Sequence, residues 1–415
     1  MSAFRISQEL DGDKRRNLLQ LFAAGLLFWL SLSSLLATLP TYIQSLGATP
    51  EQVGLVMGSF AIGLLLTRTW MGRLCDRRSR KLVILLGAVV VATAPLGYLL
   101  ADSVPLLAGI RAYHGICIAG FTTGYSALVV DLAPLKQRGE IVGYMSLVVP
   151  VGMAIGPACG GLLQAQVGDG PLFWFSAAAG LLALVLASQV QEPVRPSGVS
   201  EEIPGSSRSF WQILGSPALQ IPALVLLQVG LIFGILVAFL PLHIADAQIP
   251  LNPGWFYTAA AIASFGARLF TGKASDRLGR GLFISISLVF YGASMWLLAQ
   301  AQLPGELLVA GFLEGAGGGV LVPCAIASCP IAPTPPSGGR VFAICMGGFD
   351  VGIALGGPLM GSLASVVGYR GIFQLGALLA ALALMVFLTR GSKGMGHSWR
   401  FAWGREPDAY AVEKG

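Results

Sequence analysis

Charged residues are scarce in this chain. Only 11% of its 415 residues are Asp, Glu, Lys or Arg, whereas about 25% of a soluble domain is charged. The hydrophobic share is 55%, and the mean hydropathy is +0.74. So few charges cannot cover a water-facing surface, which excludes a soluble globular domain. The net charge of +6 does not indicate nucleic-acid binding either, because the basic residues are spread over short loops.

Residues that build enzyme and metal sites are also few. The chain has three histidines and six cysteines, and no two cysteines form a C-x-x-C pair. Gly272-Lys273 is followed by Ala274 and lacks the upstream glycine of a phosphate-binding loop. We therefore expect no enzyme activity, no cofactor and no metal. Energy for any transport must come from an ion gradient or from the gradient of the solute itself.

Long apolar runs are abundant. A run of roughly 20 apolar residues spans a bilayer as a helix. The first run is too long for a signal-peptide core and has no good cleavage site, which indicates an uncleaved helix. The sequence predicts an all-α membrane protein with twelve transmembrane segments near 17–39, 52–71, 82–101, 105–128, 141–164, 171–190, 218–240, 253–271, 282–301, 306–329, 341–364 and 370–389.

The twelve segments divide into two halves. We predict an N-terminal six-helix half at 1–191, a cytoplasmic linker rich in Pro, Ser, Gly and Glu at 192–216, a second half at 217–390 and a cytoplasmic tail at 391–415. Residues 72–81 align with 272–281 at an offset of 200. The same offset pairs Arg68 with Arg268, Gly115 with Gly315 and Gly152 with Gly352. A parallel repeat of this kind predicts a transporter whose solute site forms near the midplane between the halves.

The distribution of Lys and Arg sets the orientation. If both termini are cytoplasmic, 22 of the 26 basic residues fall on the cytoplasmic side. The opposite orientation places nearly all of them outside, against the positive-inside rule. We expect a multi-pass protein of the cell (plasma or inner) membrane with both termini cytoplasmic. The tail stretch His397–Trp403 has two interpretations, a segment resting at the membrane interface or a disordered tail.

The repeated loops carry a motif. Residues 72–81 read G-R-L-C-D-R-R-S-R-K, and residues 272–281 read G-K-A-S-D-R-L-G-R-G. The first resembles the signature loop of the major facilitator superfamily, G-x-L-x-D-R-x-x-R-K, and the second copy lies where that family has it. The resemblance covers essentially the whole chain and implies the major facilitator fold, with two six-helix bundles related by pseudo-twofold symmetry. It implies gating roles for Gly72, Asp76, Arg77, Arg80, Gly272, Asp276, Arg277 and Arg280.

Within those loops the resemblance implies that Asp76 latches against the eleventh segment and holds one access state. The alternative is that both loops are basic anchors for anionic lipid. That alternative explains the Arg and Lys residues. It explains neither the first glycine, which lets helices approach closely, nor the Asp76 and Asp276 carboxylates within basic runs.

A second motif lies in the fifth segment, where Gly152, Gly156, Pro157 and Gly160 match g-x-x-x-G-P-x-x-G-G. This motif is typical of the drug/proton antiporter branch of the superfamily. The three glycines at i, i+4 and i+8 form one stripe, which membrane helices also use simply to pack, and Pro157 adds a bend. The fourth segment is close to the family's R-x-x-x-G-x-G, but Cys117 replaces the last glycine and His114 stands where an amide is common.

Ionisable residues deep in a membrane are costly and are therefore functional candidates. Only Arg111, Glu314 and Asp350 lie well inside predicted segments. His114 follows Arg111 by three residues and so shares its helix face. We expect Glu314 or Asp350 to carry a proton, with Glu314 favoured, and His114 to relay it or to bind solute. The alternative is a structural ion pair, for instance between Arg111 and Glu314.

Gln228, midway along the seventh segment, is a weaker candidate for the solute cavity, since a lone amide also serves as a helix–helix hydrogen bond. Together these features predict a monomeric secondary transporter that exports a small amphipathic or neutral organic solute in exchange for protons. The alternatives are a facilitator or importer of a metabolite such as a sugar, and a ligand sensor that transports nothing.

Overall fold

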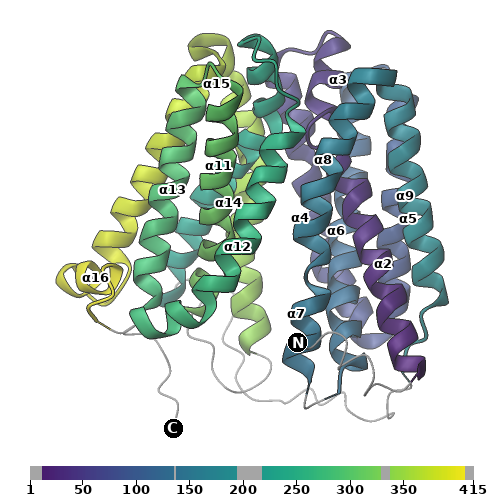
Figure 1. Cartoon of the computed structure of the whole chain (residues 1–415), viewed down its shortest axis with the longest axis horizontal. Coiled ribbons are helices and arrows are strands. Elements are labelled where there is room, and N and C mark those ends of the chain that lie inside the picture. Colours follow the sequence, from purple (N-terminus) through teal and green to yellow (C-terminus); the bar gives the residue numbers. More distant parts are fainter. Residues whose placement is uncertain (1–11, 135–136, 194–216, 329–336, 407–415) are drawn as a thin grey trace. The chain divides into compact units, whose positions relative to one another are not determined.

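The computed structural model describes residues 12–134, 137–193, 217–328 and 337–406, and these residues form helices and no strands (Figure 1). In the first half of the chain the helices are α2 (Gly12–Ser34), α3 (Leu39–Ser45), α4 (Pro50–Arg77), α5 (Arg80–Leu99), α6 (Val104–Leu132), α7 (Arg138–Met145), α8 (Val148–Val167) and α9 (Asp169–Gln189). In the second half they are α11 (Pro217–Asp246), α12 (Gly254–Leu278), α13 (Arg280–Gln300), α14 (Pro304–Ala327), α15 (Ser337–Arg390) and α16 (Met395–Ala402).

These helices confirm the predicted membrane fold. Within the described residues, ten spans are long and apolar enough to cross a membrane. One of them, Cys345–Arg390, has 46 residues and contains the predicted twelfth segment and most of the eleventh, because the chain turns at Gly368 with a φ of 69°. Helix α12 is not among the ten, but its bounds cover the predicted eighth segment. The described helices thus accommodate all twelve predicted segments.

Two predicted segments differ from continuous helices. The fifth divides into α7 and α8, and the first, predicted to end at residue 39, corresponds to α2 and is followed by α3, which continues the span to Ser45. At the end of α2, Ser33 donates to the carbonyl of Trp29 at 2.6 Å and Ser34 donates to that of Ser31 at 2.8 Å. Hydroxyl groups that bond back to the helix in this way compete with the backbone ladder and bend helices. Pro40 then supplies no amide donor for a continuous helix.

By its internal contacts the chain divides into two compact units. Unit 1 comprises Met1–Tyr42 and Ser59–Gly205, and unit 2 comprises Ile43–Gly58 and Ser206–Gly415. The core of unit 1 includes Phe28 of α2 stacked on Phe121 of α6, with ring centroids 4.0 Å apart. Tyr125 extends this aromatic column and donates to the carbonyl of Met145 at 2.9 Å.

The two units repeat the same local geometry at the offset of 200. Helices α5 and α13 begin at Arg80 and Arg280. A side chain on Gly115 would collide with the backbone carbonyl of Phe60 in α4, and one on Gly315 would collide with that of Ala260 in α12. The glycines thus let the paired helices touch backbone to backbone in both units. A second equivalence is the turn at Gly168 and at Gly368, where φ is 86° and 69°.

Candidate functional site

The candidate residues of unit 1 lie on one face of α6. Arg111 and His114 are both buried, and both interact with the aromatic ring of Phe60. The guanidinium carbon of Arg111 lies 4.6 Å from the ring centroid of Phe60, a cation–π arrangement. The ring of His114 meets the same ring edge to face at 5.8 Å. The predicted pairing of Arg111 and His114 on one helix face is thus supported by a shared neighbour.

Tyr98 of α5 completes this cluster. Its hydroxyl lies 3.2 Å from Nδ1 of His114, and its ring packs against Phe173 of α9 at 5.6 Å. Tyr42 donates to the carbonyl of Tyr98 at 2.9 Å and also packs against Phe173. The result is a largely aromatic environment around one cation and one imidazole.

Two polar atoms of this cluster lack protein partners. Among the described residues, no hydrogen-bond partner is found for Nε2 of His114 or for Nε of Arg111, although both atoms are buried. A buried donor or acceptor without a partner costs about 1–3 kcal/mol. Such atoms need a functional explanation, and binding of a solute is one.

In unit 2 the main candidate is Glu314 of α14, whose residue is 8% exposed. The hydroxyl of Tyr291 and one carboxylate oxygen of Glu314 both approach the same side of Gly318, one turn further along α14. Tyr257 of α12 is also close enough for its hydroxyl to interact electrostatically with Glu314. A carboxyl group therefore lies inside unit 2 near two phenols.

The remaining deep candidates lie on α11 and α15. Gln228 and Asp350 are both buried, and Oε1 of Gln228 has no hydrogen-bond partner within the described residues. The two helices touch through glycines. A side chain on Gly230 would collide with the carbonyl of Phe349, and one on Gly352 with that of Leu227. Arg111 and Glu314 belong to different units, so the structural ion pair between them stays a prediction.

The fifth-segment motif packs on α2. Side chains on Gly152, Gly156 and Gly160 would collide with Trp29, Ser33 and the backbone of Ser34, respectively. In addition, Ser33 donates to the carbonyl of Gly152 at 2.9 Å. Pro157 lies buried inside α8. The packing interpretation of this stripe is thus realised in the structure, while its role in antiport stays a prediction.

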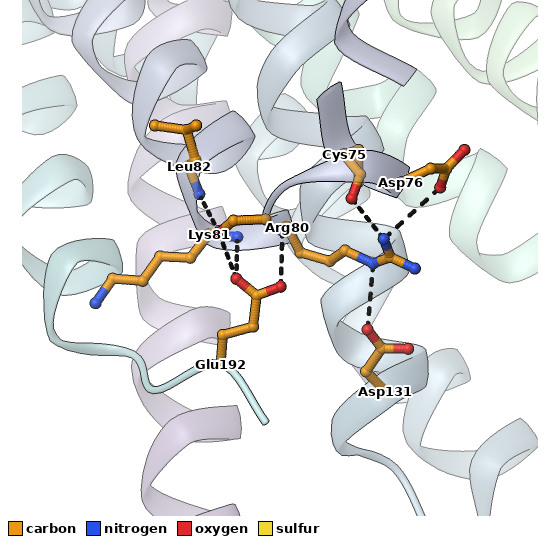
Figure 2. A network of polar contacts seen from close by, with 8 residues as sticks. Cys75, Asp76, Arg80, Lys81, Leu82, Asp131 and Glu192 are labelled. Atoms are coloured by element: carbon orange, nitrogen blue, oxygen red, sulfur yellow. Dashed lines mark hydrogen bonds and ion pairs between the residues drawn. The ribbon is translucent and has the colours of Figure 1, made fainter. Parts of the chain in front are cut away.

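The first predicted gating loop contains an ion network centred on Arg80 (Figure 2). The guanidinium lies 3.2 Å from a carboxylate oxygen of Asp131 at the end of α6 and 3.7 Å from one of Asp76, and it donates to the carbonyl of Cys75. Arg80 thus ties the ends of α4 and α6 to the start of α5. Arg77 is exposed. A methyl group added at Gly72 would have no described atom within 4 Å, so the close approach expected there is not seen.

Glu192 closes the same loop from the other side (Figure 2). Its carboxylate accepts hydrogen bonds from the backbone amides of Arg80 at 2.9 Å and Lys81 at 3.2 Å, and from the hydroxyl of Ser79. An anion at a helix N-terminus satisfies free amides and favours the helix dipole. The predicted linker therefore begins with a residue that is fixed to α5. Its remainder from residue 194 lies outside the described residues.

The second predicted gating loop lies between α12 and α13. Arg277 is exposed and Arg280 is half-buried at the start of α13. Gly272 and Asp276 fall in the last turns of α12, and the surroundings of both lie outside what the structure describes. Whether this loop gates transport thus stays a prediction.

Several of these contacts escaped sequence reasoning. Tyr98, Tyr257, Tyr291, Asp131 and Glu192 were not among the candidates. The three tyrosines carry hydroxyl groups inside apolar helices, where a buried phenol usually has a polar partner. The two acids stand at ends of predicted segments that are expected to be cytoplasmic, next to a loop with five basic residues. Both patterns were available as signals.

Two units of apolar helices, built on one internal repeat and holding buried ionisable groups, define a multi-span membrane transporter. The signature of the Major Facilitator Superfamily matches residues 21–252 and 250–400, and the chain belongs to this family. The family predicted from the two loops and the absence of enzyme activity are thereby confirmed.

Curated relatives are multidrug resistance proteins. The chain is 28% identical over 378 residues to multidrug resistance protein MdtG of Serratia proteamaculans, which covers 88% of this chain and 91% of the relative. It is 27% identical over 378 residues to MdtG of Enterobacter lignolyticus, which covers 88% and 89%. These relatives confirm the resemblance to the multidrug-efflux branch of the superfamily.

Solved structures share the fold. The nucleoside transporter NupG matches with a TM-score of 0.76 and 13% identity, covering 91% of this chain and 99% of NupG. A bacterial homologue of the human lysosomal transporter Spinster matches with a TM-score of 0.69 and 19% identity, covering 95% and 93%. At these identities the likeness concerns the fold alone.

Proposed function

We propose that the protein exports small amphipathic or neutral organic solutes in exchange for protons by alternating access. The observation that carries this proposal is Glu314, a carboxyl group enclosed in unit 2 beside Tyr257 and Tyr291. Burial in an apolar interior disfavours the charged form of a carboxyl group. A change in its surroundings between access states therefore changes its proton occupancy, which is what exchange of protons requires.

The aromatic cluster of unit 1 supports the proposed solute class. Phe60, Tyr98 and Phe173 make the surroundings of His114 and Arg111 aromatic and apolar, while Nε2 of His114 and Nε of Arg111 are polar atoms that a solute could contact. A single guanidinium is a poor match for a multiply charged solute such as a phosphate ester, whose binding normally recruits several basic groups. The multidrug resistance relatives favour the same class.

The same proposal includes an orientation and a location. The protein lies in the cell (plasma or inner) membrane as a monomer, with both termini and the 192–216 linker on the cytoplasmic side. The distribution of basic residues supports this orientation.

Flux into sealed vesicles tests the proposal. Purified protein is reconstituted, and uptake of a fluorescent amphipathic dye such as ethidium is followed with and without an imposed pH gradient. We expect dye to accumulate against its own gradient only when the pH gradient is present. Dye movement that stops at equal concentrations, whatever the pH gradient, indicates a facilitator. Dye binding that raises thermal stability without any flux indicates a sensor.

A further inference from the structure

The segment after α15 folds into a short helix, α16, that docks on unit 2 (Figure 1). Ser398, Phe401 and Ala402 form its buried face. The ring of Phe401 lies 5.9 Å from that of Phe387 in α15, and Ser285 of α13 donates to the carbonyl of Ala402 at 3.0 Å. Of the two interpretations of the tail, disorder is therefore wrong for residues 395–402.

Helix α16 covers the loop between α12 and α13. A side chain on Gly281 would collide with the backbone carbonyl of Phe401, so the two backbones are in contact. Gly404 lies against the same loop, because a side chain on it would collide with the carbonyl of Leu278, next to Gly279. The helix thus rests on the second copy of the predicted gating loop, as Glu192 rests on the first.

A second apolar stripe at α16 is not covered by any part of the chain that the structure describes. Met395, Trp399 and Trp403 follow at i, i+4 and i+8, and they are 72%, 52% and 50% exposed. The two indole rings lie side by side, with centroids 6.0 Å apart. At 100° per residue this stripe adjoins the buried face and is separated from it by no polar residue, whereas His397 and Arg400 lie on the opposite side. The apolar face of α16 is therefore wider than the part that packs on α13 and α15.

The segment that contains this stripe is rich in basic residues. Arg390, Lys393, Arg400 and Arg405 are all exposed, and Glu406 is the only acid between residues 390 and 406. Glu406 pairs with Arg400 at 2.8 Å and lies 3.0 Å from His397. The segment therefore keeps a surplus of positive charge next to its exposed tryptophans.

The position of α16 in the chain bears on what can cover the stripe. It starts only five residues after α15, a membrane-spanning helix, has ended at Arg390. A helix tethered so closely cannot leave the bilayer surface. Trp side chains are enriched in the headgroup region, and the cytoplasmic leaflet carries anionic lipids that attract Lys and Arg. The tryptophans and basic residues of α16 thus match the lipid headgroup region in both polarity and charge.

We propose that α16 is an interfacial helix that places Trp399 and Trp403 in the headgroup region of the bilayer. The basic residues of this segment, Arg390, Lys393, Arg400 and Arg405, bind anionic phospholipid headgroups. Because α16 also contacts Gly279 and Gly281, the lipid surface is linked through it to the α12–α13 loop. This proposal concerns a lipid contact and holds whatever solute the protein carries.

Quenching by brominated lipid tests the proposal on the full chain. The protein is reconstituted in vesicles of phosphatidylcholine brominated near the headgroup end of its acyl chains, with or without phosphatidylglycerol brominated at the same positions. The difference in emission between the parent and the variant with both Trp399→Phe and Trp403→Phe gives the emission of these two indoles. The matched control is Trp296→Phe, an exposed indole on α13 with no basic neighbours in sequence.

We expect the Trp399 and Trp403 emission to be quenched by the brominated lipid, and more strongly when phosphatidylglycerol is present. Lys393→Gln with Arg405→Gln should remove the phosphatidylglycerol effect, whereas Lys14→Gln with Arg15→Gln, two exposed bases on α2, should retain it. Emission that resists brominated lipid but is quenched by iodide in the water overturns the proposal. Quenching that is equal with and without phosphatidylglycerol overturns the anionic-lipid contact.

A second readout does not depend on the tryptophan variants folding. Met395→Cys, at the most exposed position of the stripe and placed in a chain without other cysteines, is labelled with a polarity-sensitive dye. We expect a blue-shifted emission in vesicles that is enhanced by phosphatidylglycerol. An emission maximum equal to that of the dye in water contradicts the interfacial placement.

Discussion

The hydroxyl of Tyr98 lies 3.2 Å from Nδ1 of His114, and this contact fixes the imidazole from one side only. If the hydroxyl donates to Nδ1, the proton of the neutral ring is on Nε2, which then points a free donor into the aromatic cluster. The orientation of His114, and with it the polar contact available to a solute, therefore depends on a tyrosine from the preceding helix.

Tyr98→Phe removes that hydroxyl and leaves Nδ1 buried without its partner. We expect the variant to lose about 1–3 kcal/mol of unfolding free energy and to bind the dye more weakly. The control is Tyr113→Phe, because Tyr113 is exposed and its hydroxyl contacts Thr93 at 2.8 Å. Thermal unfolding followed by tryptophan fluorescence measures the stability of both variants. Equal shifts for the two variants would show that the Tyr98–His114 contact has no special weight.

Glu314→Gln keeps the shape of the side chain but cannot change its charge. We expect it to abolish dye accumulation driven by a pH gradient while leaving dye binding and dye exchange intact. Glu306→Gln, in the same helix, is the matched control, because Glu306 caps the start of α14 through the amides of Gln302 and Leu303 and an amide oxygen can still accept those bonds. Vesicle flux assays separate the two.

Two other outcomes for Glu314 are informative. If Glu314→Gln fails to fold and Arg111→Gln partly restores it, the pair is a structural ion pair. If Glu314→Gln and Asp350→Asn both keep full gradient-driven transport, the protein is a uniporter or uses another ion.

Asp76→Asn tests the predicted latch. The side chain of Asp76 is 79% exposed, and Arg80 retains Asp131 and the carbonyl of Cys75 without it. We therefore expect an unchanged melting temperature but an altered transport rate, because a small differential stabilisation of one access state shifts populations. Asp102→Asn, an exposed loop acid, should alter neither quantity. A variant at Asp76 that transports like the parent shows that this carboxylate is not a latch.

Gly156→Ala tests the packing of α8 on α2. A methyl group there would collide with Ser33, and overpacking of this kind typically costs about 1–3 kcal/mol. Gly109→Ala is the matched control, since Gly109 lies inside α6 with no described atom close to the added methyl. We expect it to stabilise the helix by up to about 1 kcal/mol. A lower melting temperature for Gly156→Ala and a higher one for Gly109→Ala, each relative to the parent, would confirm that only Gly156 packs closely.

Accessibility labelling tests the orientation. Thr49→Cys and Arg78→Cys are exposed positions in loops at the two ends of α4, and each is introduced into a chain without other cysteines. We expect a membrane-impermeant maleimide added to intact cells to label Thr49→Cys only. Labelling of Arg78→Cys alone would invert the topology.

The sequence predicted much of the fold because spanning length and charge distribution are properties of single segments. The predicted first segment lacks the break after Ser34 and the continuation through α3 to Ser45, since the break depends on back-bonding by Ser33 and Ser34, which a hydropathy profile cannot register. The folding of α16 was left open, because an eight-residue helix is stable only through its packing on Ser285 and Phe387.

For the candidate site, the sequence predicted which ionisable groups are buried but not their neighbours. Arg111, His114 and Glu314 could be located by depth alone. That Tyr98 would meet His114, or that Tyr291 would approach Glu314, depends on how α5 packs on α6 and α13 on α14. The rotation of each helix about its axis sets those contacts, and the sequence of a single segment does not specify that rotation.

The constant spacing of 200 residues between equivalent positions bears on the connecting loops. Arg80 and Arg280, Gly115 and Gly315, and Gly168 and Gly368 keep this spacing although several loops separate them. Surface loops ordinarily tolerate insertions and deletions, so equal lengths in two copies of different sequence are not expected of slack connections. We infer that the packing of the helices requires these short connections to keep their length. Adding even one residue to the turn at Gly168 or Gly368 should therefore be less tolerated than most substitutions within the helices it joins.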